Sequence, residues 1–239
     1  MAMTFKSELF DICSEVVSEF PDWSFSSGDF KKTISNHSTI KISLGFYFRH
    51  GNTPLGPAFF IEHKKSMTLY KKLKIYPRAT SIVAFQNIAQ RLKHTPEAFR
   101  TGGMIVEDKR FMMSVAPPSE RPRTRILDIT ESRPVLRATM MDGIELLGEL
   151  YDFSSEENFL RNLPPKYETR ASTIPYDEYE RQKGLMLCIV HMLLGDFDYV
   201  ERYSSDDYKT IFPKRPELAN IVTALPELKR KYAETGKIV

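Results

Sequence analysis

The sequence is poor in cysteine and in long hydrophobic runs, and each shortage excludes a class of protein. Only two of its 239 residues are cysteine, Cys13 and Cys188, and both lie among apolar residues in segments with helical patterning. We therefore expect two buried thiols in a reducing compartment and no disulfide framework. The longest apolar run, Leu185–Leu194, contains His191 and is far shorter than the ~20 residues that cross a bilayer. With no secretory signal pattern at the N-terminus, these features predict a cytoplasmic protein without a membrane segment.

The sequence also lacks the local signatures of catalytic and metal sites. Its five histidines show neither the His-x-x-x-His nor the His-Glu-x-x-His spacing of zinc sites. There is no Gly-x-Ser-x-Gly elbow, no Walker loop and no Gly-x-Gly-x-x-Gly turn. Cys188 could act as a nucleophile only if a histidine such as His191 lay beside it, and the apolar context favours a hydrogen-bonded core histidine instead. We expect no cofactor, no metal and no catalytic residue, although an enzyme with a dispersed site stays open.

Charge, by contrast, is plentiful and divided unevenly along the chain. Residues 1–125 carry 19 Lys and Arg against 11 Asp and Glu, whereas residues 126–239 carry 15 against 20. The acidic excess is greatest from Asp142 to Asp207, with 15 acids against 6 bases. This distribution predicts a dipolar surface, and such surfaces steer charged macromolecules.

Hydrophobic periodicity predicts an α+β fold. Residues 40–48 alternate apolar and polar, which is typical of a half-buried strand, and apolar residues of 5–20 share one helical face. From about residue 134 most segments have helical periodicity, including an apolar helix over 175–194. We predict one α+β domain over residues 1–239, with an antiparallel sheet in the N-terminal half packed against a mostly helical C-terminal half.

Finer predictions concern the boundaries within this domain. The β-rich part should span 1–130 and the helical part 131–239, with a candidate sub-domain boundary near 116–134, where three prolines precede a short strand. Residues 81–94 have helical patterning, and segments 104–106 and 111–115 suggest a hairpin. Pro216 and Pro226 should each begin a helix, because proline is favoured in the first turn.

A basic run follows the predicted sheet. Residues 64–78 contain six positive charges and no acid, with Tyr70 and Tyr76 interleaved. Such a run can neutralise phosphates and stack bases, or it can be a solvated face whose aliphatic stems cover apolar surface. The candidate nucleic-acid contacts are Lys64, Lys65, Lys71, Lys72, Lys74 and Arg78.

An acidic, tyrosine-bearing segment lies near residue 200. Paired carboxylates can hold a divalent cation, but Asp196-x-Asp198 is only a fragment of a calcium loop, so no metal is expected. The same residues suit docking against a basic protein, in which aromatic side chains anchor the contact and charges accelerate encounter; plain solvation is the alternative. The candidate partner-binding residues are Asp196, Asp198, Tyr199, Glu201, Tyr203, Asp206 and Asp207.

Three local patterns add a family resemblance. They are Trp23-x-Phe25-x-x-Gly28-x-Phe30-Lys31-Lys32, Leu44-Gly45-Phe46-Tyr47-Phe48-Arg49 and Leu193-Leu194-Gly195-Asp196-Phe197-Asp198-Tyr199, preceded by an amphipathic first helix. In this order the chain resembles the small α+β immunity proteins that bacteria pair with polymorphic or secreted toxins. The resemblance implies a cytosolic, non-enzymatic inhibitor that binds a cognate toxin and covers its active site.

The acidic segment and the resemblance together favour one function. We expect an immunity-type protein that neutralises a cognate protein toxin, which would be a nuclease if the acids mimic phosphates. A nucleic-acid-binding module that uses the basic run and an enzyme with a dispersed site are the alternatives.

Overall fold

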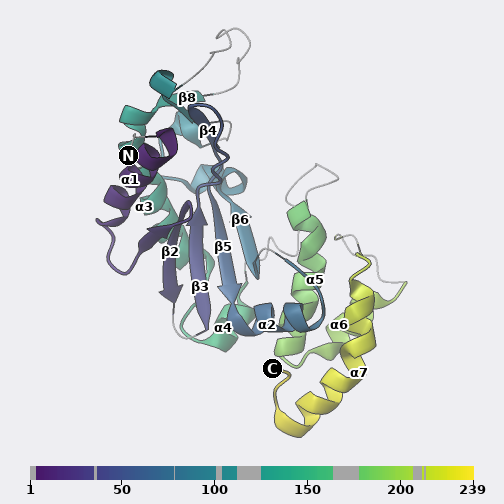
Figure 1. The fold of residues 1–239 in the computed structure, drawn as a ribbon. Helices are drawn as coiled ribbons and strands as arrows, with labels where there is room; N and C mark the ends of the chain where they lie inside the picture. Colours follow the sequence, from purple (N-terminus) through teal and green to yellow (C-terminus); the bar gives the residue numbers. More distant parts are fainter. Residues whose placement is uncertain are drawn as a thin grey trace. The chain divides into compact units, whose positions relative to one another are not determined.

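The computed structural model describes residues 4–34, 37–77, 79–100, 104–111, 125–163, 178–206, 212 and 214–239. The fold is α+β, with a five-stranded antiparallel sheet in the N-terminal half and a mostly helical C-terminal part (Figure 1). The predicted fold class is therefore confirmed.

The chain forms two compact units, and each draws segments from distant parts of the sequence. Unit 1 comprises residues 1–33, 39–60 and 83–148, and unit 2 comprises residues 34–38, 61–82 and 149–239. The last passage of the chain between the units falls after residue 148, whereas the sequence analysis placed a boundary near 116–134. Residues 116–124 of that range lie outside the described residues.

The larger sheet has the order β1-β2-β3-β5-β6. Its strands are β1 (Ser24–Ser26), β2 (Asp29–Ile34), β3 (Ser38–Ser43), β5 (Ala58–His63) and β6 (Ser81–Ala84). Strands β1 and β2 pair antiparallel across a two-residue turn, in which Ser27 and Gly28 have φ angles of 57° and 85°. Positive φ at both turn positions matches the twist of the strands that it joins.

Strand β3 is shorter than the alternating pattern of residues 40–48 indicates. Ile40, Ile42 and Leu44 are fully buried, as the pattern predicts, but the strand ends at Ser43. Gly45 has a φ of 68°, and a Cβ there would lie 2.7 Å from the carbonyl oxygen of Gly56. The close approach of these two backbones requires glycine and ends the regular ladder.

The smaller sheet has three strands, β4 (Asn52–Leu55), β7 (Met104–Glu107) and β8 (Arg125–Asp128). Strand β7 pairs antiparallel with β4 and parallel with β8. Both edges of β7 are thus occupied, and the predicted hairpin between 104–106 and 111–115 is wrong. Phe111 ends a short 3₁₀ helix, η3 (Lys109–Phe111), and residues 112–115 lie outside the described part of the chain.

Two long helices belong to unit 1. Helix α1 (Phe5–Val17) begins at Thr4, whose side-chain oxygen accepts from the backbone N–H of Ser7 at 3.2 Å. Helix α3 spans Ser132–Leu150.

The predicted helix over 81–94 is wrong, because Ser81–Ala84 form strand β6 and only a 3₁₀ helix, η1 (Phe85–Arg91), follows. Three successive buried residues, 81–83, fit a strand that is covered on both faces. The remaining 3₁₀ helices are η2 (Glu97–Phe99) and η5 (Ile129–Glu131).

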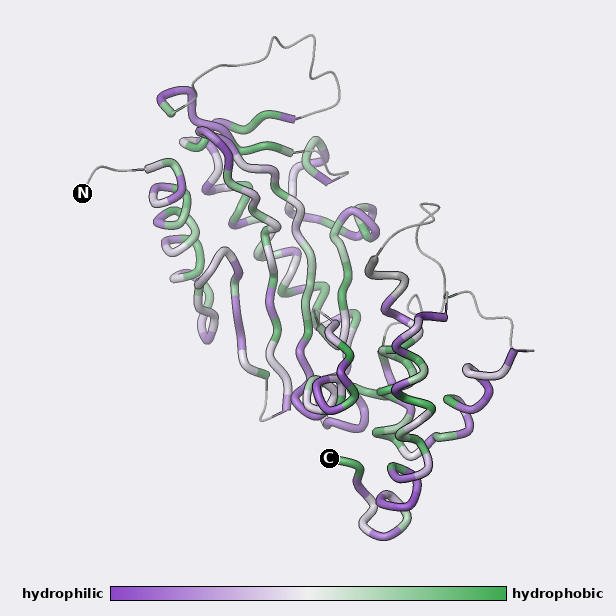
Figure 2. The backbone as a smooth tube through the Cα atoms, turned by 45° about the vertical axis from the view of Figure 1, so that its right-hand side comes forward, coloured by the Kyte–Doolittle hydropathy of each residue, from purple (hydrophilic) through white to green (hydrophobic). Residues whose placement is uncertain are grey.

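Unit 2 is built on helices α2 (Lys64–Lys72), α4 (Glu156–Arg161), α5 (Glu178–Leu193), α6 (Phe197–Ser204) and α7 (Leu218–Thr235). Its core combines apolar side chains of α2, α5, α6 and α7. The second half of α5 is predominantly hydrophobic (Figure 2) and nearly all of it is buried. Gly184 lets the ring of Tyr203 lie against α5, because a Cβ at that position would fall 1.9 Å from the tyrosine hydroxyl.

Proline 226 departs from its predicted role. It lies inside α7 and does not begin a helix, although an interior proline removes one backbone hydrogen bond. The buried side chains of Ile221, Leu225 and Leu228 place one apolar face on the core on both sides of the proline. Packing of that face holds the helix together across the missing bond.

Candidate functional site

Asp196, the first of the predicted partner-binding residues, has a structural role at the start of α6. Its Oδ1 accepts from the backbone N–H of Tyr199 at 3.2 Å, and its Oδ2 lies 2.8 Å from Nδ1 of His191. Partial burial is the largest influence and would raise the pKa of Asp196, but the hydrogen bonds with His191 and the Tyr199 backbone and the attraction of Arg202 together outweigh it, and the net shift is downward. Both carboxylate oxygens are therefore occupied within the turn that joins α5 to α6.

The acids of this segment that remain accessible lie on the outer face of α6 and just after its end. Asp198, Glu201 and Asp206 are exposed, whereas Asp207 lies outside the described residues. Glu201 is paired with Lys229 of α7, with 2.5 Å between Oε1 and Nζ. In the part of the chain that the structure describes, Asp198 and Asp206 have no ion-pair partner.

The two tyrosines of α6 differ in exposure. Tyr203 is only 1% exposed and packs in the core of unit 2, so its predicted role as a surface anchor is wrong. Residues 197, 200 and 203 form the buried face of the amphipathic helix, as the period of α6 requires. Tyr199 is half-buried, and its ring stacks on the imidazole of His191 at 3.7 Å with an interplanar angle of 3°.

Elsewhere in the acidic segment the carboxylates are used inside the fold. Asp142 is buried and accepts from the backbone N–H groups of residues 93, 94 and 95, which lowers its pKa although burial opposes the shift. Glu145 pairs with Lys93 and His94. Asp152 accepts from the backbone and hydroxyl of Ser154, and this lowers its pKa. These acids are thus neutralised or hydrogen-bonded locally.

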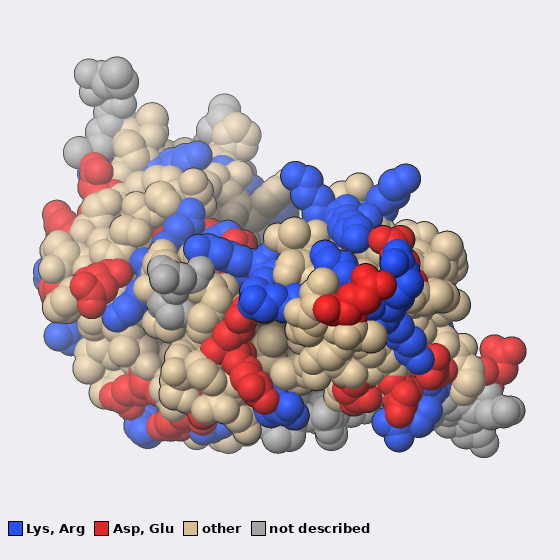
Figure 3. All heavy atoms as spheres, turned by 90° about the horizontal axis from the view of Figure 1, so that it is seen from below, with Lys and Arg blue, Asp and Glu red and all other residues tan. Residues whose placement is uncertain are grey.

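The division of charge along the sequence does not carry over to the folded units. Unit 1 contains 15 Lys and Arg against 14 Asp and Glu, and unit 2 contains 19 against 17, because each unit combines early and late segments. On the face drawn in Figure 3, acidic and basic side chains lie interspersed. Each unit is therefore nearly neutral, and the charge separation predicted from the sequence is reduced to local patches of acidic or basic side chains.

Helix α2 and the residues after it present the basic run. Lys64, Lys71 and Lys74 are exposed. Lys65 binds Glu156 with 2.5 Å between Nζ and Oε2, and Lys72 lies 3.9 Å from Glu227. Arg78 lies outside the described residues. Of the interleaved aromatics, Tyr70 is buried and Tyr76 is 78% exposed, so only Tyr76 is available to stack on a base.

The structure adds a constellation that the sequence analysis missed. His63, the last residue of β5, is the N-cap of α2, and its Nδ1 lies 2.8 Å from the hydroxyl of Ser66 and accepts from the Ser66 backbone N–H. Its Nε2 lies 2.7 Å from Oε1 of Glu156 on α4. Burial lowers the pKa of His63 and outweighs the opposing effect of Glu156. The neutral imidazole thus accepts at Nδ1 and donates from Nε2.

A serine, a histidine and a glutamate in one chain of hydrogen bonds have the composition of a hydrolase triad. Ser66 and His63 are, however, both fully buried, so no substrate reaches the serine hydroxyl in this structure. The arrangement instead supplies the N-cap of α2 and fastens it to α4. The sequence signal for the cap was His63 at the end of a strand, three residues before Ser66. No sequence signal pointed to Glu156, which lies 93 residues away.

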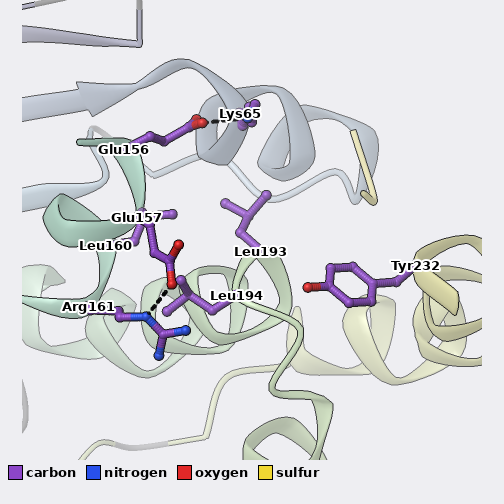
Figure 4. Close-up of a pocket in the computed structure, with 8 residues that line it drawn as sticks. All are labelled: Lys65, Glu156, Glu157, Leu160, Arg161, Leu193, Leu194 and Tyr232. Carbon is purple, nitrogen blue, oxygen red and sulfur yellow. Dashed lines mark hydrogen bonds and ion pairs between the residues drawn. The ribbon is translucent and has the colours of Figure 1, made fainter. Parts of the chain in front are cut away.

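A pocket of about 210 Å³ lies beside this constellation (Figure 4). Ion pairs Lys65–Glu156 and Glu157–Arg161 line it, and the hydroxyl of Tyr232 points toward Leu193 and Leu194. Every charge in its lining is paired with an opposite one, so the pocket offers no net charge to a ligand. We assign it no catalytic role.

A metal cluster and a membrane-spanning helix are both absent from the described residues. Among the residues that the structure describes, no group of three His, Cys, Asp or Glu side chains could hold a metal ion, and no helix is long and apolar enough to cross a bilayer. Comparisons with protein-family models, with curated proteins and with solved structures found no match.

Proposed function

We propose that this chain is an immunity-type protein, which binds a cognate toxin in the cytoplasm through α6 and neutralises the toxin by covering its active site. The observation that supports the proposal is that Asp198 on α6 and Asp206, two residues after the helix ends, are exposed and have no ion-pair partner among the described residues. Exposed carboxylates of this kind accelerate the encounter with a basic protein such as a nuclease.

Tyr199 supplies the anchor that such an interface requires. Its ring is partly exposed and is held by the stack on His191, which Asp196 orients in turn. An aromatic side chain that is rigid before binding loses little conformational entropy on association, and tyrosine is enriched among residues that dominate binding energy. The interface is thus smaller than the acidic segment and centres on Asp198, Tyr199 and Asp206, with Glu201 beside them.

Charge reversal on α6 tests this proposal. The polypeptide encoded beside this chain is the candidate toxin, and its association rate is measured at low salt with the D198K/D206K double variant. We expect the rate to fall by at least ~10-fold, because steering by exposed charges acts mainly on association. The matched control is Glu227→Lys on α7, an exposed acid outside this face. Equal rates for the double variant, the control and the unchanged protein would remove α6 from the interface.

One observation favours a second candidate, a nucleic-acid-binding surface on α2. Lys64, Lys71 and Lys74 are exposed, and no acid among the described residues pairs with them. The exposed ring of Tyr76 lies two residues after Lys74. Filter binding of single-stranded RNA and DNA at two salt concentrations tests whether this surface binds nucleic acid, because phosphate contacts weaken steeply with salt. The absence of salt-sensitive binding would exclude this function.

A further inference from the structure

The pairing of β3 with β2 stops at the residue where β2 begins, Asp29. Strands β2 and β3 are neighbours, and the last backbone contact between their ends joins the N–H of Leu44 to the carbonyl of Gly28 at 3.4 Å. At Ser27 and Gly28 the chain turns back into β1. The segment that continues from β3 therefore extends past its neighbour in the sheet.

This continuing segment, residues 45–48, has one satisfied edge and one open edge. On one side the N–H of Tyr47 donates to the hydroxyl of Thr53 at 2.8 Å, and Arg49 bridges with Asn52. The backbone groups of Phe46 and Phe48 alternate with these, and no hydrogen bond joins them to any described residue. The N–H and C=O groups of Phe46 and Phe48 are thus available to pair with another chain, as those of an edge strand are.

A groove of about 580 Å³ runs along this open edge. It is bounded by Lys6 and Phe10 of α1, by the turn at 27–29, and by Phe46 and Phe48. The three rings of Phe10, Phe46 and Phe48 contact one another, with centroids 5.4 to 6.2 Å apart, and all three remain partly exposed. The groove thus joins unpaired backbone groups to an aromatic floor.

One cation stands over this floor. The ammonium of Lys6 lies 5.3 Å from the ring centre of Phe10 and 5.5 Å from that of Phe48. Lys6 is exposed and has no acidic partner among the described residues. A carboxylate on an occupant of the groove can pair with Lys6, whereas Asp29, which also lines the groove, disfavours a carboxylate at its own end.

We propose that the groove binds an extended peptide segment of a partner protein, which adds as a strand along Phe46–Phe48. The segment pairs its backbone with these two residues, places an apolar side chain on the three phenylalanines and directs an acidic side chain to Lys6. This mode obtains affinity from main-chain hydrogen bonds and specificity from alternate side chains. The site lies in unit 1 and is independent of the toxin proposal, which concerns α6.

The competing explanation is that Lys6 protects the edge. Native sheets place lysines on open edges to prevent pairing with other chains. The two explanations differ in outcome, because a protected edge rejects every extended peptide, whereas a binding edge selects a defined pattern.

Selection from a phage-displayed library of random twelve-residue peptides tests the proposal on the full chain. We expect the enriched peptides to alternate apolar and polar residues and to share one acid. A synthetic peptide of the consensus sequence should lose at least ~10-fold in affinity against Lys6→Glu, as for other charge-assisted contacts. The charge-reversed control Lys109→Glu, at an exposed residue that does not line the groove, should bind it like the unchanged protein.

Hydrogen exchange distinguishes strand addition from other binding. The amides of Phe46 and Phe48 should exchange fast in the free protein and become protected when the consensus peptide binds, whereas the Tyr47 amide, already bonded to Thr53, should change little. Three outcomes would overturn the proposal. They are a failure to enrich any peptide pattern, binding that leaves both amides unprotected, and self-association of the chain through this edge.

Discussion

His63 and Glu156 are joined by a hydrogen bond of 2.7 Å between Nε2 and Oε1, although they lie 93 residues apart in the sequence. The histidine is fully buried, and its other nitrogen caps α2 through Ser66. One neutral imidazole therefore holds the start of α2 and the start of α4 together within unit 2. Its protonation state controls how well both contacts are made.

Stability should consequently fall as the pH is lowered through the range in which this histidine titrates. Burial lowers the pKa of His63 in the folded chain below the value of 6.5 expected when it is unfolded, so the unfolded state takes up the proton first. The contribution of neutral His63 to the free energy of unfolding is complete above pH 6.5. It is lost as the pH falls toward the lower pKa that His63 has in the folded chain. The measurement is the urea unfolding midpoint between pH 8 and pH 5. Glu156, whose pKa is lowered from 4.5, acts only at lower pH.

The variant His63→Asn separates this effect from other titrations. Asparagine keeps an oxygen near the position of Nδ1 and is a favoured N-cap, but it has no proton to exchange. We expect a less stable chain above pH 6.5 whose remaining stability depends less on pH between 8 and 5. An unchanged slope in the variant would show that other groups cause the pH dependence.

Gly45→Ala should destabilise unit 1. The residue has a φ of 68°, and its new Cβ would fall 2.7 Å from the carbonyl oxygen of Gly56, a backbone atom. Strain of this kind costs about 1–3 kcal/mol, measured as the change in free energy of unfolding. Gly56→Ala is the matched control, because nothing lies within 4 Å of a Cβ there. Equal losses in the two variants would contradict the argument.

Gly184→Ala should destabilise the core of unit 2. Its Cβ would meet the hydroxyl of Tyr203 at 1.9 Å, and Tyr203 is buried with no room to withdraw. Overpacking of a core costs about 1–3 kcal/mol. Gly148→Ala in α3 meets no atom within 4 Å and should instead stabilise its helix by up to ~1 kcal/mol. Thermal unfolding of both variants checks the opposite signs.

Both cysteines should resist thiol reagents in the native state. Cys13 and Cys188 are fully buried, and burial raises the pKa of each thiol to about 12. Only the thiolate reacts readily, so labelling by Ellman's reagent should proceed at the rate of unfolding and become rapid in denaturant. Fast labelling of either thiol in native buffer would show that its segment opens locally.

Regular periodicity made much of the fold predictable. The helical stripe of α1 and the apolar half of α5 each combine local pattern with tertiary burial, and each forms where the sequence places it. The errors fall where distant contacts decide the structure. Residues 81–84 form a strand because β5 lies beside them, and β7 pairs with β4 and β8, which no local pattern indicates.

The candidate surface was harder to predict, because accessibility and pairing depend on the fold. Tyr203 is of a residue type that often anchors protein interfaces, but it lies on the buried face of α6. Glu201 and Asp196 have the charge of a docking surface but bind Lys229 and His191. The backbone groups of Phe46 and Phe48 are unpaired because the neighbouring β1–β2 hairpin turns back at Ser27 and Gly28. The alternating sequence pattern does not reveal the position of that turn relative to Phe46.

The most direct test of the toxin proposal is survival of bacteria that express the polypeptide encoded beside this chain. Co-expression of the unchanged chain should restore growth and the D198K/D206K variant, if equally abundant and folded, should restore it less. Growth arrest that persists in the presence of the unchanged chain, or full rescue by the double variant, would contradict inhibition through α6.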